Sequence, residues 1–147
     1  MLQRRPEIVI GIDPGVETGF AVWSRSSKQF LELSTLSFWA AYDRVTAYQT
    51  DEIEIFIENP DSQRAMYVRT ETVKIQRQRE RIAKNIGSNR REATLLAERL
   101  TALGYAVRPV SPIKARKWDA AQFKRYTNYE GRTSQHVRDA ARLVVGM

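Results

Sequence analysis

The sequence has no cysteine among its 147 residues. Disulfides and thiolate metal sites are therefore excluded, and the chain is compatible with a reducing compartment. It also lacks any apolar run long enough to span a membrane, and its basic N-terminal residues precede only a short apolar run without a small-residue cleavage pattern. We expect a soluble cytoplasmic protein with no membrane partner. The length suits one well-buried core and is too short for two, so residues 1–147 are interpreted as a single domain.

The charge of the chain is unevenly distributed. Residues 1–60 carry five Lys and Arg against nine Asp and Glu, whereas residues 61–147 carry 19 against eight, and the formal net charge is +7. A basic half of this kind favours a polyanionic partner, most often nucleic acid, because each neutralised phosphate releases counterions. For any single Arg, a solvated helix face is the simpler explanation.

The hydrophobic pattern predicts a mixed α/β fold around one sheet. Five stretches read as strands, the first nearly all apolar and the next two forming an antiparallel meander: 8–13, 20–24, 29–36, 53–58 and 105–110. Apolar residues at helical spacing predict helices between them. These are Phe38, Ala41, Tyr42, Val45 and Tyr48, and then Ala93, Leu96, Ala97, Leu100 and Leu103, with Ser88 as N-cap and Gly104 as terminator. Pro112 is expected to open a further helix, and the last helix runs from residue 134 or 135 to Val145.

Two acidic residues end predicted strands. Asp13 closes the first strand and Glu58 the fourth, where Pro60 stops the ladder. If the two strands are adjacent and parallel, both carboxylates emerge at one edge of the sheet. Two unpaired carboxylates in proximity repel unless a cation lies between them. Such a pair is costly for structure and useful for chemistry.

The terminal helix offers two further candidate ligands. His136 and Asp139 are three residues apart and share one helix face. Oxygen ligands with one imidazole suit Mg²⁺ or Mn²⁺ better than zinc. The alternative is that Asp139 is a surface residue paired with Arg142 and that His136 has no chemical role.

Three segments together resemble a known family. The sequences IGIDPGVETGFAVW, FIENP and HVRDAARLVV are similar to the opening motif, the second acidic strand end and the C-terminal helix of the RuvC branch of the RNase H-like nucleases. The resemblance implies a five-stranded mixed sheet flanked by helices and a metal-dependent Holliday junction resolvase, acting as a homodimer on a four-way DNA junction. The matching catalytic positions are Asp13, Glu58, His136 and Asp139. The short chain would suit a bacterial or phage enzyme.

Phosphodiester hydrolysis needs a nucleophilic water, charge compensation and help for the leaving oxygen, which two divalent ions supply together. We expect two Mg²⁺ ions per site, with Mn²⁺ as a substitute. Asp13 would bridge them, Glu58 and Asp139 would each hold one, and His136 would ligate or stabilise the scissile phosphate. Gly15 and Gly19 would let the DNA backbone approach Asp13, although ordinary turn chemistry also explains them.

The basic residues fall into two groups. Residues 64–84 read as a mobile arm or loosely packed helix over the junction, or as a solvated helix face; the candidate DNA contacts there are Tyr67, Arg69, Lys74 and Arg77. The second group precedes the terminal helix, and by resemblance Lys114 fits a phosphate contact best, followed by Arg116, Lys117 and Lys124. Trp118, Phe123 and Tyr126 are expected to pack this segment on the sheet rather than to stack on bases.

One feature departs from the family. Its cellular members place an aromatic wedge shortly after the second acid, where this chain has Asn-Pro-Asp-Ser-Gln-Arg-Ala-Met-Tyr, so Met66 or Tyr67 would have to serve. Two other functions remain open: an RNA-processing nuclease of the same fold, resembling the YqgF-like proteins, and a non-catalytic protein that binds branched DNA. The helix at residues 93–103 is a candidate dimer interface, although core packing explains its apolar stripe more simply.

Overall fold

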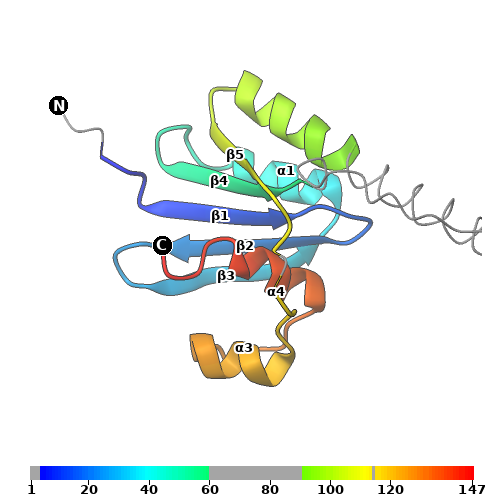
Figure 1. Ribbon diagram of the computed structural model, residues 1–147. Helices are drawn as coiled ribbons and strands as arrows, with labels where there is room; N and C mark the ends of the chain where they lie inside the picture. Colours follow the sequence, from blue (N-terminus) through cyan, green and yellow to red (C-terminus); the bar gives the residue numbers. More distant parts are fainter. Residues whose placement is uncertain (1–3, 60–90, 114) are drawn as a thin grey trace, which may run out of the picture.

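The structure is a computed structural model that describes residues 4–59, 91–113 and 115–147 (Figure 1). Its first three elements are antiparallel strands. They are β1 (Ile8–Asp13), β2 (Thr18–Ser24) and β3 (Gln29–Leu36). The predicted meander is confirmed, and β1 and β3 have the predicted bounds. β2 begins two residues earlier than predicted, because the antiparallel ladder continues to the pair of Asp13 with Gly19.

Two parallel strands complete the sheet. β4 (Ile53–Glu58) pairs with β1, and β5 (Ala106–Val110) pairs with β4 at the edge, in the order β3-β2-β1-β4-β5. The five-stranded mixed sheet with helices on its faces is therefore as predicted. Between β3 and β4 the chain forms α1 (Phe38–Thr46), which begins after Ser37, whose side chain accepts a hydrogen bond from the Ala40 amide. This helix ends before Tyr48, two residues short of the predicted stripe.

One face of the sheet is covered by α1 and by the helical residues 91–102. Its core consists of alternate strand residues packed against these helices: Ile10, Ile12, Phe20, Val22, Ala41, Val45, Ile53, Ile55, Ile57, Ala93, Leu96, Leu100 and Tyr105. Leu103 was expected in the same stripe but is 40% exposed, because it lies beyond residue 102. The chain then turns at Gly104, which has the positive φ of 97° that favours glycine. The predicted N-cap Ser88 lies outside the described residues.

The opposite face is covered by α3 (Ala120–Thr127) and α4 (Gln135–Arg142). The helix expected at Pro112 is absent from the described residues there, since 111–113 and 115–119 are irregular. α3 instead begins after Asp119, which forms a reciprocal capping box with Gln122. The last helix ends at Arg142 rather than Val145, and turns follow it.

The aromatic residues around α3 divide into two kinds. Phe123 is buried against the sheet and Trp118 is partly buried beside it, as predicted. Tyr126 is 55% exposed, so the prediction that it packs on the sheet is wrong. It lies at the end of α3, one residue before Thr127, and its ring contacts Trp118 rather than the sheet.

α4 packs unusually close to the sheet. A Cβ atom added at Gly11 of β1 would collide with the Ala140 carbonyl, and one added at Gly19 of β2 would collide with the His136 carbonyl. The structure therefore gives Gly19 a role different from the one expected from the sequence. Gly19 makes room for α4, and through it for His136 and Asp139, rather than for an approaching DNA backbone.

Candidate active site

Asp13 and Glu58 lie side by side at the carboxyl ends of two adjacent parallel strands. The register of β1 and β4 pairs Ile12 with Ile57, so the next residue of each strand is an acid. Both acids are on the face that carries α4, because Val9 and Phe56 on the same alternation belong to that core. The two carboxyl groups are close enough for each to shift the pKa of the other. The juxtaposition predicted from the sequence is therefore present.

The pair is electrostatically unfavourable. Burial, the hydrogen bond with Asp13 and the charges of Asp13 and Asp139 together raise the pKa of Glu58 to about 8. Burial and the charge of Asp139 also raise the pKa of Asp13, against the lowering effects of the hydrogen bond and of Lys117. A pKa of about 8 favours the protonated form of Glu58 at neutral pH, because burial and the neighbouring carboxyl groups disfavour its charge.

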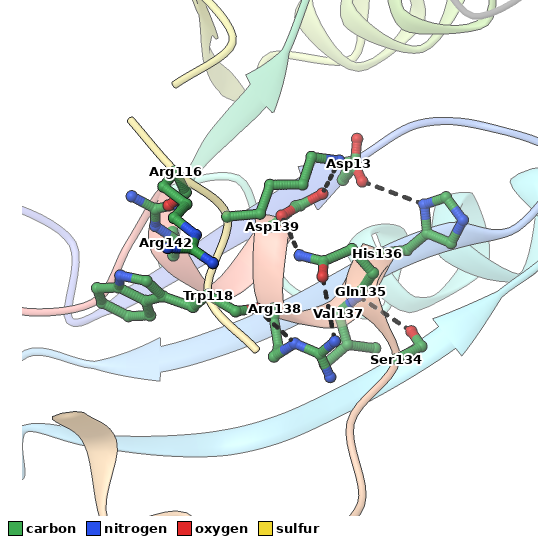
Figure 2. A network of polar contacts seen from close by, with 11 residues as sticks. Asp13, Arg116, Trp118, Ser134, Gln135, His136, Val137, Arg138, Asp139 and Arg142 are labelled. Atoms are coloured by element: carbon green, nitrogen blue, oxygen red, sulfur yellow. Dashed lines mark hydrogen bonds and ion pairs between the residues drawn. The ribbon is translucent and has the colours of Figure 1, made fainter. Parts of the chain in front are cut away.

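Asp139 comes from α4 and is held by two donors (Figure 2). Its Oδ2 accepts from the Lys117 ammonium at 3.0 Å and its Oδ1 from the Gln135 amide at 2.8 Å. The alternative pairing with Arg142 does not occur, since Arg142 donates instead to the carbonyl of Arg116 at 3.1 Å. The negative charge of Asp139 also raises the pKa of Lys117, which holds that side chain in its charged form.

His136 lies on the same helix face as Asp139, one turn earlier (Figure 2). Its Nδ1 is 3.4 Å from Oδ2 of Asp13, and about half of its side chain is exposed. The four predicted catalytic residues therefore lie together. Glu58 and His136 are both next to Asp13, and the negative charge of Asp139 raises the pKa values of Asp13 and Glu58.

A brace within α4 fixes the orientation of Gln135. The Arg138 guanidinium donates to Oε1 of Gln135 at 3.1 Å, to the Thr133 carbonyl at 2.6 Å and to the Trp118 carbonyl at 2.9 Å. With its Oε1 occupied, the Gln135 amide turns its Nε2 to Asp139. Sequence reasoning did not identify Gln135 or Arg138, although a Gln four residues before an Asp is a known helical pairing that could have indicated the first.

The predicted DNA contacts have different outcomes. Arg116 and Lys124 are exposed, and Lys124 lies 4.0 Å from Glu130. Lys117 turns instead into the acidic cluster, as described above. The remaining predicted contacts lie outside the described residues: Tyr67, Arg69, Lys74, Arg77 and Lys114, together with the alternative wedge Met66.

A pocket lies between the end of β4, the segment before α3, and α4. It is lined by Glu58, Ile113, Lys117, Asp139, Arg142 and Leu143. Within the described residues, no three Asp, Glu and His side chains are arranged as a metal centre. The carboxyl groups of Asp13, Glu58 and Asp139 nevertheless supply the oxygen ligands that a hard divalent cation takes, and a cation beside Glu58 would favour its ionised form.

Comparisons with family models, with curated proteins and with solved structures found no match for this chain. In the part of the chain that the structure describes, no helix is both long enough and apolar enough to cross a membrane.

Proposed function

We propose that the protein is a divalent-metal-dependent endonuclease of the RNase H-like, RuvC type that cuts branched DNA, with the four-way junction as its preferred substrate. The observation that carries the proposal is the juxtaposition of Asp13 and Glu58 at the ends of adjacent parallel strands, with Asp139 of α4 beside Glu58 in one pocket. The strand order and the mixed directions of the sheet agree with this fold.

The acidic pair is hard to explain by stability alone. A buried carboxylate usually has a cationic partner or several hydrogen-bond donors, because its desolvation is otherwise uncompensated. Among the described residues, Asp13 and Glu58 lie beside each other, His136 Nδ1 is 3.4 Å from Asp13, and the Lys117 ammonium donates to Asp139 rather than to either acid of the pair. A site built to hold a cation accounts for this arrangement.

The residues that would hold Mg²⁺ or Mn²⁺ are Asp13, Glu58 and Asp139, with His136 adjacent to Asp13. Bound divalent ions supply a more acidic water and charge compensation for the phosphoryl oxygens. Lys117 is positioned to contribute positive charge beside the same phosphate once Asp139 has another partner. The exposed guanidinium of Arg116 and the ammonium of Lys124 would bind the DNA backbone further from the cut.

Two further features support DNA and a dimer. The excess of Lys and Arg in residues 61–147 suits a long polyanion. A four-way junction is resolved by two symmetric cuts, which an isologous dimer with two identical sites would make. The homodimer is part of the proposal.

The test is cleavage of an end-labelled four-way junction, compared with a linear duplex and an RNA hairpin, in Mg²⁺ or Mn²⁺. We expect paired symmetric cuts near the branch point. Asp13→Asn should lower the rate by about a thousandfold while junction binding in EDTA persists, because the loss of metal-based stabilisation is worth several kcal/mol.

The matched control is Asp51→Asn, the same substitution at an exposed turn residue, which should leave cleavage unchanged. Cleavage of the RNA hairpin alone would favour an RNA-processing nuclease of the same fold. Tight junction binding without cleavage in either ion would make the protein a binding module and would refute the catalytic proposal.

A further inference from the structure

A second surface lies next to the acidic site and has a different chemistry. Trp118 and Tyr126 lie with their ring centroids 4.9 Å apart and their planes tilted by 44°. The Arg142 guanidinium lies 4.6 Å from the centre of the Trp118 ring, and that of Arg125 lies 6.0 Å from the Tyr126 ring. We refer to Trp118, Tyr126, Arg125 and Arg142 as the aromatic ledge.

The ledge is anchored on one side and open on the other. Trp118 packs on the core through Phe123, at a centroid distance of 6.4 Å, and its carbonyl is held by Arg138. Tyr126 is 55% exposed. Since α3 is already fixed to the sheet by Phe123, the Tyr126 ring contributes little to the core.

The ledge is continuous with the candidate active site. Arg142 lines the pocket that holds Glu58 and Asp139, and Trp118 directly follows Lys117. Each of the two rings has a guanidinium group over it, Arg142 at Trp118 and Arg125 at Tyr126. The ledge therefore combines a positive field with flat aromatic surface.

We propose that the aromatic ledge binds an unpaired DNA strand by stacking a base against Tyr126 and Trp118 while the flanking guanidinium groups neutralise its phosphates. A single strand fits this chemistry because its bases expose their faces, whereas in a duplex those faces are stacked on neighbouring pairs. The inference deepens the proposed function. It assigns to the same site a contact with unpaired nucleotides close to the cut, as occur where strands exchange at a branch point.

The test measures binding in EDTA, where no cleavage occurs, so its outcome is independent of the nuclease activity. The full chain carrying Trp39→Phe is used, since Trp39 is 67% exposed and would otherwise contribute fluorescence from the other face of the sheet. Oligo(dT) is titrated and the quenching of tryptophan fluorescence is followed. A strand of equal length and charge that lacks its bases serves as the matched ligand.

Stacking predicts quenching by oligo(dT) and little quenching by the abasic strand. Tyr126→Ala should weaken oligo(dT) binding about tenfold, within the range measured for removing one base-stacking ring, while Tyr126→Phe should bind as the parent does. Both variants should melt at the parent temperature because the side chain is mostly exposed. Trp118→Phe should abolish the quenching signal yet retain binding.

Three results would overturn the proposal. Equal binding of the abasic strand would reduce the ledge to a charged patch. An oligo(dT) affinity that does not change in Tyr126→Ala would show that the strand binds outside the aromatic ledge. A change in tryptophan fluorescence that depends on protein concentration without DNA, and that both Trp118→Phe and Tyr126→Ala remove, would assign the ledge to contact with a second copy of the chain.

Discussion

Glu54 and Glu58 lie on the same strand, on the same face and four residues apart, yet they have opposite electrostatic environments. Glu54 accepts hydrogen bonds from Arg25, at 2.7 Å, and from Arg108. Burial alone would raise its pKa, but the two guanidinium groups outweigh burial and lower it. Glu58, at the other end of β4, is paired with the acid Asp13, and its pKa is raised to about 8.

The difference separates a carboxylate that joins neighbouring segments from one to which the proposed function assigns a ligand. Arg25 also donates to the Pro6 carbonyl at 2.6 Å, so the Glu54 cluster ties the N-terminal segment, β2 and β5 to β4. Because burial and the neighbouring Asp13 raise the pKa of Glu58, ionisation of Glu58 opposes folding. Within β4, the charge of Glu54 is compensated by two guanidinium groups. Among the described residues, the charge of Glu58 has no such partner at the place where we expect a cation to bind.

The largest expected effect comes from making the same substitution at both ends of β4. Glu54→Gln should destabilise the protein by about 3 kcal/mol, because it leaves the largely buried Arg25 without its anionic partner. Glu58→Gln should be neutral or stabilising at pH 8 in EDTA, since it removes a carboxyl that resists ionisation. Urea denaturation of the two variants measures both values, and equal losses would erase the proposed distinction.

The second prediction concerns the brace on Asp139. Gln135→Met keeps the length of the side chain but removes the amide that donates to Asp139. We expect Mn²⁺ affinity to fall about 10-fold to 100-fold, as for other residues that orient metal ligands. Titration calorimetry measures the affinity, and Gln49→Met, an exposed residue far along the chain, is the control. An unchanged affinity would show that Asp139 needs no brace.

The third prediction sharpens the role of Lys117 as a resident cation. Lys117→Met removes the ammonium bound to Asp139, so Mn²⁺ should bind about tenfold more tightly, or about 1.4 kcal/mol, in line with the removal of one nearby positive charge. Lys124→Met, which removes an exposed ammonium from α3, should have no effect. The same calorimetric titration measures the Mn²⁺ affinity of both variants. Weaker Mn²⁺ binding in Lys117→Met would contradict the prediction.

The smallest expected effect is a pH dependence of stability. A carboxyl whose pKa rises on folding binds its proton more tightly in the native state, so stability falls as pH increases from about 4.5, its ordinary value, to about 8. We expect the melting temperature in EDTA to drop by a few degrees over this window. Glu58→Gln should flatten the profile. Glu7 and Glu54, whose pKa values are lowered, act only below this window.

The fold was largely predictable because its strands carry local patterns. The bounds of β1, β3 and β4 follow from an apolar run that ends at Asp13 and from stretches of mixed apolar and polar residues that end at Leu36 and Glu58. The irregular segment before α3 was not predictable, because Arg138 and Arg142 hold its carbonyls from a helix 20 and 26 residues further along the chain. Pro112 alone suggests a helix start, and only the capping box at Asp119 marks the true one.

The site was predictable in part for the same reason. The proximity of Asp13 and Glu58 was predictable because their strands were expected to be adjacent and parallel. The shared face of His136 and Asp139 was predictable because helical spacing is regular. The pairing of Lys117 with Asp139 depends on the tertiary path of residues 115–119, which no local pattern specifies. The role of Gly19 was misjudged for a similar reason, since the atom that excludes its Cβ belongs to a residue 117 positions later in the chain.

The close approach of α4 to the sheet has a consequence for tolerance to substitution. At Gly11 and Gly19 even one methyl group meets backbone atoms of α4, which cannot rotate away as a side chain would. In a saturation mutagenesis screen scored by activity, both positions would reject every residue as strictly as Asp13 does, although neither touches a ligand. Intolerance to substitution would therefore assign Gly11 and Gly19 to the active site by mistake. A parallel measurement of protein abundance would separate the two glycines from the acids.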